Sequence, residues 1–171
     1  YATRDTPSHR VSLHASNSDC QQAVSSMVTA IIIPDITVTT QPTNVNECVG
    51  GLDQMTVAIS GGSGLVSYQW QSSTDGNAPW ANAVGTGSTT NTFTPPSVTP
   101  GTTYYRVLVN ATGSDCQQAV SSVVTAIIIP DITVTTQPTN VNECVGGLDQ
   151  MTVAISGGSG LISYQWQSST D

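Results

Sequence analysis

The chain has 171 residues, only 8% of them charged, and eleven acidic residues against three basic ones give a net charge of −8. There is no lysine, which excludes the basic face that a nucleic-acid-binding protein needs and a polybasic contact with a membrane surface. No apolar run approaches the roughly 20 residues of a membrane span, so we expect no membrane insertion. Thr, Ser, Val, Gly, Ile and Asn dominate the composition, which favours strands and turns over helices.

One segment occurs twice, because Asp19–Asp75 recurs as Asp115–Asp171 at an offset of 96 residues (115 − 19 = 96). Only two of the 57 aligned positions differ, and both exchanges keep an apolar side chain, as a core position demands. A period of this length suits a small independent domain, since solenoid units run roughly 20 to 50 residues. We therefore divide the chain into 1–33, the last two strands of one repeat; 34–129, a complete repeat; and 130–171, the first three strands of the next.

Alternating apolar residues predict about seven short strands in the complete repeat, separated by turns rich in Gly, Pro, Asn and Asp. Cys48 is expected in a loop, and Asp75-Gly76-Asn77 is a turn signal. The pattern predicts an all-β fold, an antiparallel sandwich of two sheets. The predicted strands are Ile36–Val38, Met55–Ser60, Val66–Trp70, a short segment at Trp80, a Thr-rich strand ending at Phe93, Tyr105–Val109, and Gln117–Ile129.

Three stretches of the complete repeat together resemble a known family: Asn46–Gly51 (NECVGG), Tyr68–Gly76 (YQWQSSTDG) and Gly101–Val107 (GTTYYRV). They resemble an immunoglobulin-like domain and, more narrowly, the tandem immunoglobulin-like repeats of giant extracellular adhesins and surface fibres of Gram-negative bacteria. The resemblance implies that Trp70 lies on strand C and Tyr105 on strand F, both in the core. It also implies an extracellular location at the cell surface.

The four cysteines occupy two repeat-equivalent positions, and a polar, lysine-free chain of this kind suits an oxidising compartment. We expect Cys48 to pair with Cys116, and Cys20 and Cys144 each to pair with a neighbouring repeat or subunit. Antibody domains carry their cysteines in the middle of strands, whereas a disulfide between these cysteines would join segments at one end of the sandwich. A bridge closing about 69 residues would stabilise the domain by roughly 4 kcal/mol. The alternative is buried free thiols.

Catalytic groups are scarce, because the complete repeat contains no His and no Lys. Ser-His-Asp and Cys-His arrangements are therefore impossible within it, and we predict no enzyme, no cofactor and no metal. The lack of lysine also excludes a Lys–Asn isopeptide bond. Asp35 and Asp131 could bind calcium, but solvated surface acids are the simpler interpretation. Trp80 could stack on a sugar, but a tryptophan at the edge of the core is simpler. Asn110 begins a glycosylation motif, for which a chance match is the simpler interpretation.

The linker between repeats contains Ile129 and Pro130 and has no Gly or Ser spacer, so consecutive sandwiches should stack stiffly. Three consecutive isoleucines cannot all face one core, and the surplus should pack against a neighbour. Residues 1–33 and 130–171 each lack part of a core. Either the sequence is a window on a longer chain, or the two parts complete each other between subunits.

These observations predict a structural repeat of an extracellular bacterial filament, fibre or adhesin stalk, whose partner is another copy of itself. The alternative is an adhesive module that binds a glycan or protein on a surface adhesin made of many repeats. Copies in tandem suit both hypotheses, because avidity also gains from repetition. A third hypothesis is a spacer attached to an enzyme elsewhere in the parent chain.

Overall fold

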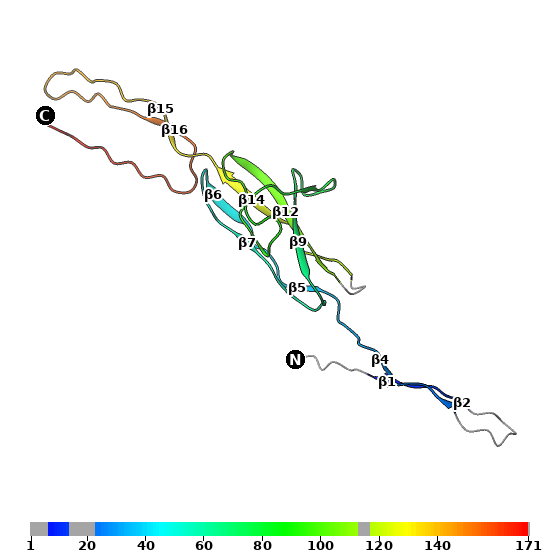
Figure 1. The fold of residues 1–171 in the computed structure, drawn as a ribbon. Coiled ribbons are helices and arrows are strands. Elements are labelled where there is room, and N and C mark those ends of the chain that lie inside the picture. Colours follow the sequence, from blue (N-terminus) through cyan, green and yellow to red (C-terminus); the bar gives the residue numbers. More distant parts are fainter. Residues whose placement is uncertain (1–6, 14–22, 113–116, 171) are drawn as a thin grey trace.

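The computed structural model describes residues 7–13, 23–112 and 117–170, and all regular structure among them is β-strand. Figure 1 shows the three parts following one another along the molecule, with the complete repeat between the N-terminal and C-terminal parts. Within the described residues, no helix is long and apolar enough to cross a membrane. In the N-terminal part, β1 (Ser8–His9) pairs with β4 (Val28–Thr29) and β2 (Ser12–Leu13) with β3 (Ala23–Val24), all antiparallel and exposed.

The larger sheet of the complete repeat is centred on its longest strand, β12 (Gly101–Ala111). Along the sheet the order is β10 (Ala81–Asn82), β9 (Val66–Ser73), β12, β14 (Val124–Ile129) and β6 (Val45–Cys48), and β13 (Ala119–Val120) also pairs with β12. All pairs are antiparallel except β14 with β6, which run parallel.

The opposing layer consists of two short antiparallel pairs. Strand β5 (Thr37–Thr40) pairs with β8 (Ala58–Ser60), and β7 (Met55–Thr56) pairs with β11 (Thr92–Phe93). Two facing layers with this connectivity form an immunoglobulin-like β-sandwich, so the predicted fold class is confirmed.

The core lies between the layers and is built around the aromatic residues of β9, β11 and β12. Trp70 and Val107 are cross-strand partners and are both 0% exposed. The Trp70 ring stacks on Phe93, and Phe93 in turn contacts Tyr105, each pair with 5.2 Å between ring centroids. The indole N–H of Trp70 donates to the backbone oxygen of Thr90 at 2.9 Å, which satisfies its only polar atom.

The structure corrects the predicted strands in three places. Cys48 ends strand β6 rather than lying in a loop, because Val45 (3% exposed) fills the core beside Ala126 and aligns the segment on β14. The predicted strand Met55–Ser60 is two strands, interrupted where the Val57 N–H donates to Asn91 O at 2.9 Å. The predicted strand Gln117–Ile129 is also two, β13 and β14.

A buried serine occupies the break between β13 and β14. The Ser121 N–H donates to Val107 O, and the Ser121 hydroxyl accepts from the Val107 N–H, both at 3.0 Å. The side chain therefore satisfies the β12 backbone where the ladder is interrupted. Nearby, the Gln41 side-chain oxygen accepts from the Ser122 N–H at 2.8 Å, and that of Asn44 accepts from the Thr125 N–H at 2.9 Å.

The C-terminal part repeats the local pairing of the complete repeat and lacks its larger sheet. Strand β15 (Thr133–Thr136) pairs with β16 (Ala154–Ser156) in the register of β5 with β8. Residues 162–169, the copy of β9, form no strand, because no strand equivalent to β12 lies beside them. Trp166 is accordingly 51% exposed, whereas the equivalent Trp70 is 0% exposed.

Candidate functional site

The complete repeat has two distinct ends, which are also the ends that meet neighbouring repeats. At the leading end, the Gly62 N–H donates to Pro34 O at 2.8 Å, and the Thr112 N–H donates to Leu65 O at 2.9 Å. Asp35 belongs to the same end. The trailing end contains residues 48–52, Ser97, Val98, Gly101 and Ile129: the Val49 N–H donates to Ile129 O at 3.1 Å, and the Gly50 N–H to Ser97 O at 3.0 Å. Strand β12 runs between them.

A carboxylate organises the loop at the trailing end. Glu47 Oε2 accepts the Asp53 N–H at 2.8 Å, and the Gly51 N–H donates to Cys48 O at 3.0 Å. The Ser97 hydroxyl donates to Gly51 O at 2.7 Å and ties the loop to the segment between β11 and β12. The second copy, in the C-terminal part, makes the same bond from the Asp149 N–H to Glu143 Oε2 at 2.9 Å. The loop geometry therefore arises from its local sequence, and sequence analysis missed the role of Glu47.

The leading end is held by a contact between segments far apart in the sequence. The Gln117 N–H donates to Asp35 Oδ1 at 3.3 Å. Asp35 is the first residue after the linker proline, and Gln117 begins the return from β12. The Asp35 carboxylate, weighed above as a calcium ligand, therefore has a protein donor. Among the described residues, no cluster of three or more His, Cys, Asp or Glu side chains is arranged to hold a metal ion.

Both ends expose large apolar side chains. At the trailing end Leu52 and Val98 are each 79% exposed, and at the leading end Leu65 is 80% exposed. The leading end of the C-terminal part likewise exposes Leu161 and Ile132. In the linker, Ile128 is buried in the core (5%), Ile127 is 40% exposed, Ile129 is half-buried and Pro130 is exposed. Only the alternating member of the three isoleucines enters the core.

Two of the four cysteines are described, and both are free and exposed thiols: Cys48 and Cys144. Their expected partners, Cys116 and Cys20, lie outside the described residues. Cys48 stands opposite Ile129 at the trailing end, and Gln117, the residue after Cys116, bonds to Asp35 at the leading end. The pairing of Cys48 with Cys116 therefore stays a prediction.

The outward face of the larger sheet presents the only arginine of the complete repeat. Arg106 lies 4.4 Å over the Trp80 ring, and its Nε–H donates to Gln71 Oε1 at 2.9 Å. Trp80 is half-buried, so the guanidinium covers part of the surface on which a sugar would stack. Asn110, on the same strand, is half-buried and accepts from the Gln118 amide at 2.9 Å.

Two ionisable side chains have pKa values displaced by their surroundings. The Asn77 backbone N–H and the Ser73 hydroxyl hold the pKa of Asp75 below its ordinary value of 3.8. The turn is the one predicted from Asp75-Gly76-Asn77; Gly76 has φ +78°, and a Cβ there would lie 3.0 Å from Tyr104. Burial raises the pKa of Tyr105 above 10.0. The two pKa shifts thus have structural causes, the hydrogen bonds of a turn at Asp75 and burial in the core at Tyr105.

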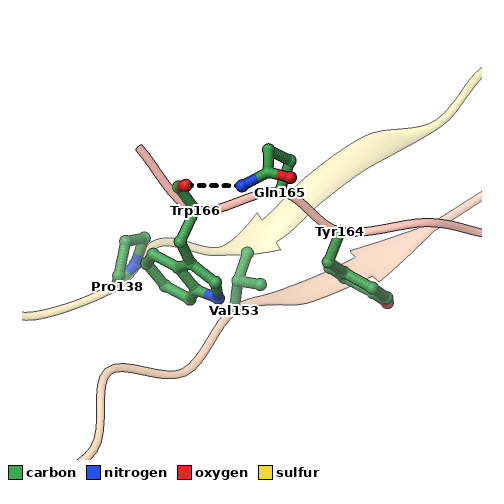
Figure 2. Close-up of a pocket in the computed structure, with 5 residues that line it drawn as sticks. All are labelled: Pro138, Val153, Tyr164, Gln165 and Trp166. Carbon is green, nitrogen blue, oxygen red and sulfur yellow. Dashed lines mark hydrogen bonds between the residues drawn. The ribbon is translucent and has the colours of Figure 1, made fainter. Parts of the chain in front are cut away.

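A hollow in the C-terminal part is lined by Pro138, Val153, Tyr164, Gln165 and Trp166, shown in Figure 2. The equivalent positions in the complete repeat include Val57 and Trp70, which are at most 1% exposed, and Trp70 there packs on Phe93. The hollow therefore corresponds to core volume that β11 and β12 fill in the complete repeat. It has the shape of an unfilled core rather than of a ligand site.

Comparison with known proteins identifies a domain family. A family model described as Domain of unknown function (DUF8696) matches residues 37–130. No curated protein matches the chain in sequence. The chain is similar to Sidekick-1 immunoglobulin domains 1-5 (14% identity, TM-score 0.43, 79% of this chain and 29% of that one). It is also similar to Drosophila OTK extracellular domains 3-5 (15% identity, TM-score 0.39, 90% and 49%). The chain thus spans less than a third of the Sidekick-1 chain, and the fold assignment rests on the strand pairing described above.

Proposed function

Since the chain belongs to the DUF8696 domain family, we propose from its own repeats and contacts that it is a structural repeat unit of an extracellular bacterial filament, fibre or adhesin stalk. The observation that carries the proposal is the junction between near-identical repeats. Strand β14 ends at Ile129 and β15 begins at Thr133, so three residues separate the last strand of one sandwich from the first strand of the next.

A short junction restricts how far two sandwiches can bend relative to each other. Pro130 fixes one backbone angle, and the linker contains no flexible Gly/Ser spacer. The exposed leucines of both ends, Leu52 and Leu161, belong to the surfaces that this short linker brings toward each other. Repetition of such a unit produces a stiff linear array, which is what a stalk or fibre requires. Such a structural role needs no catalytic groups, and the complete repeat contains no His and no Lys.

Small-angle scattering on a chain of four copies of residues 34–129 tests the proposal. We expect a rod whose maximum dimension grows by about 40 Å per added repeat, the length of one sandwich and its linker. The control carries Gly-Ser-Gly-Ser in place of residues 129–132 and should be shorter and more flexible. Dimensions that do not distinguish the two chains would contradict the stiff-stalk proposal.

The adhesive alternative would use one outward-facing feature, the Trp80 ring with the Arg106 guanidinium over it. A ring with an adjacent guanidinium can bind a sugar that carries a carboxylate. Binding of residues 34–129 to an immobilised panel of acidic and neutral glycans distinguishes the two functions. Binding that is lost in Trp80→Ala would favour the adhesive module. Absence of binding to every glycan tested would favour the structural stalk.

A further inference from the structure

We propose that the N-terminal part of one copy of this chain pairs with the C-terminal part of a second copy, so that copies link head to tail. The N-terminal part supplies paired strands equivalent to β12 and β14, and the C-terminal part supplies the segments that flank them. The two parts lie at opposite ends of the complete repeat (Figure 1), so each assembly keeps one free part at either end. Such pairing deepens the proposed fibre function, on which its biological role rests, because the partner is another copy of the chain.

The C-terminal part exposes apolar side chains that are buried in the complete repeat. Met151 is 53% exposed and Trp166 is 51% exposed, whereas their equivalents Met55 and Trp70 are both 0% exposed. Trp166 also lines the hollow shown in Figure 2. The exposed face is therefore one half of a core without the strands that cover it.

Two segments of the C-terminal part have the sequences of strands in the complete repeat. Residues 141–144 repeat β6, and residues 163–169 repeat β9 from Ser67 to Ser73. In the complete repeat β6 pairs with β14 and β9 pairs with β12. Among the described residues, no strand pairs with either segment of the C-terminal part. Both segments therefore need the same partner, the pair of strands that lies between β6 and β9 in the complete repeat.

The N-terminal part exposes the side chains that such a partner would bury. Four of its apolar side chains are 59–68% exposed, although the positions 96 residues later are at most 6% exposed in the complete repeat. The four exposed residues are Val11, Leu13, Val28 and Ile32. Their equivalents in β12 and β14 are Val107, Val109, Val124 and Ile128. The exposed face of each part therefore matches the other as the two halves of one core match.

The N-terminal part already has the internal pairing of the strands that it would replace. Strand β1 pairs with β4 and β2 pairs with β3 in the registers of β12 with β14 and with β13, 96 residues earlier. The Ser25 N–H donates to Val11 O at 2.9 Å, and the Val11 N–H donates to the Ser25 hydroxyl at 3.0 Å. Ser121 and Val107 make the same two bonds in the complete repeat. Strands that are paired beforehand lose less conformational entropy on docking.

The complete repeat also defines the register between the two copies. Val107 lies opposite Trp70 on the neighbouring strand. The same register places Val11 opposite Trp166 of the second copy, at the hollow of Figure 2. Strand β4 would run parallel to residues 141–144, as β14 runs parallel to β6. Every strand of the larger sheet except β10 then has an equivalent in the joined sheet.

The joined sandwich is smaller than the complete repeat. Neither part contains a copy of residues 76–96, so the equivalents of β10 and β11 are missing. Phe93, which stacks on Trp70 in the complete repeat, therefore has no counterpart beside Trp166. Since less of the core is closed, we expect reversible association that increases with protein concentration.

Sedimentation velocity of the 171-residue chain over a range of concentrations tests the proposal, in reductant so that no disulfide joins the copies. We expect monomer at low concentration and dimers and longer species at high concentration. Val11→Asp places a carboxylate where pairing buries the side chain, and should raise the dissociation constant at least about 100-fold. Ser12→Asp adds the same charge on the opposite face of the strand and should assemble like the unchanged chain.

Mixing two blocked variants shows which parts meet. Trp166→Asp blocks the C-terminal part, as Val11→Asp blocks the N-terminal part, and each variant alone should remain monomeric. An equimolar mixture should form dimers and nothing larger, because each variant retains one functional part. Equal urea midpoints of the complete repeat in both variants show that it folds in each.

Three results would overturn the proposal: an unchanged chain that stays monomeric at every concentration, equal assembly of Val11→Asp and Ser12→Asp, or a mixture that forms no dimer. The scattering test of the stalk uses copies of residues 34–129, which contain neither terminal part. The two proposals therefore fail independently.

Discussion

The ring of Trp70 on β9 stacks on the ring of Phe93 on β11, with centroids 5.2 Å apart and planes inclined by 22°. The two residues belong to opposite layers of the sandwich, and both are 0% exposed. Phe93 also contacts Tyr105 of β12, so one ring links three strands. The three aromatic residues are 23 and 12 positions apart in the chain, and only the closed sandwich brings them together.

Removal of the Phe93 ring should have a large effect on stability. We expect Phe93→Ala to reduce the free energy of unfolding by about 3 to 5 kcal/mol, because a fully buried ring is replaced by a cavity. Urea unfolding followed by Trp emission measures the change. Val84→Ala, at a position that is 81% exposed, is the control and should shift the midpoint little. Equal effects of the two changes would mean that the aromatic cluster does not support the fold.

Removal of the Glu47 carboxylate should loosen the trailing end. Glu47→Ala leaves the Asp53 N–H without its acceptor, and we expect a loss of about 1 to 2 kcal/mol in the free energy of unfolding. Glu143→Ala removes the same bond in the C-terminal part and is the matched control. It should leave unfolding of the complete repeat unchanged. A similar loss in both variants would contradict the local role of Glu47.

The turn at Asp75 should make stability depend on pH in the acid range. Its folded-state pKa is lower than the ordinary value of 3.8, so its contribution is complete above the unfolded value and is lost as pH falls through the folded value. A carbon-detected NMR titration should place the carboxyl midpoint below 3.8. Ser73→Ala removes one donor and should move that midpoint upward. A midpoint that Ser73→Ala does not move would argue against the hydroxyl as a cause.

The guanidinium of Arg106 should shield the ring of Trp80. In a Trp166→Phe background, Trp70 is buried, so iodide quenching reports mainly on Trp80. We expect Arg106→Ala to increase the quenching constant about twofold, since an exposed cation–π contact contributes only roughly 0.5 to 1 kcal/mol. Arg106→Lys retains the charge and loses the planar contact, and should lie between the two. Unchanged quenching in Arg106→Ala would place Trp80 outside the reach of the guanidinium.

Much of this architecture was predictable because its signals are local. The alternation along Tyr105–Val109 and the turn at Asp75 need only neighbouring residues, and both agree with the structure. The bond from the Asp53 N–H to Glu47 belongs to the same class, since it recurs in the C-terminal part without the larger sheet. Its signal in the sequence is a glutamate six residues before the loop aspartate, Glu47 before Asp53 and Glu143 before Asp149.

What only the tertiary structure decided is which segments pair and which stay exposed. The sequence Val45–Cys48 reads as polar loop and becomes a strand because β14 lies beside it. Trp70 and Trp166 occupy the same local sequence, yet one is fully buried and the other 51% exposed. The difference is the presence of β11 and β12, which come from later in the repeat. Strand pairing and core closure depend on contacts between segments that are distant in the sequence. The residues of one segment determine its tendency to form a strand, and the segments beside it determine whether it pairs and becomes buried.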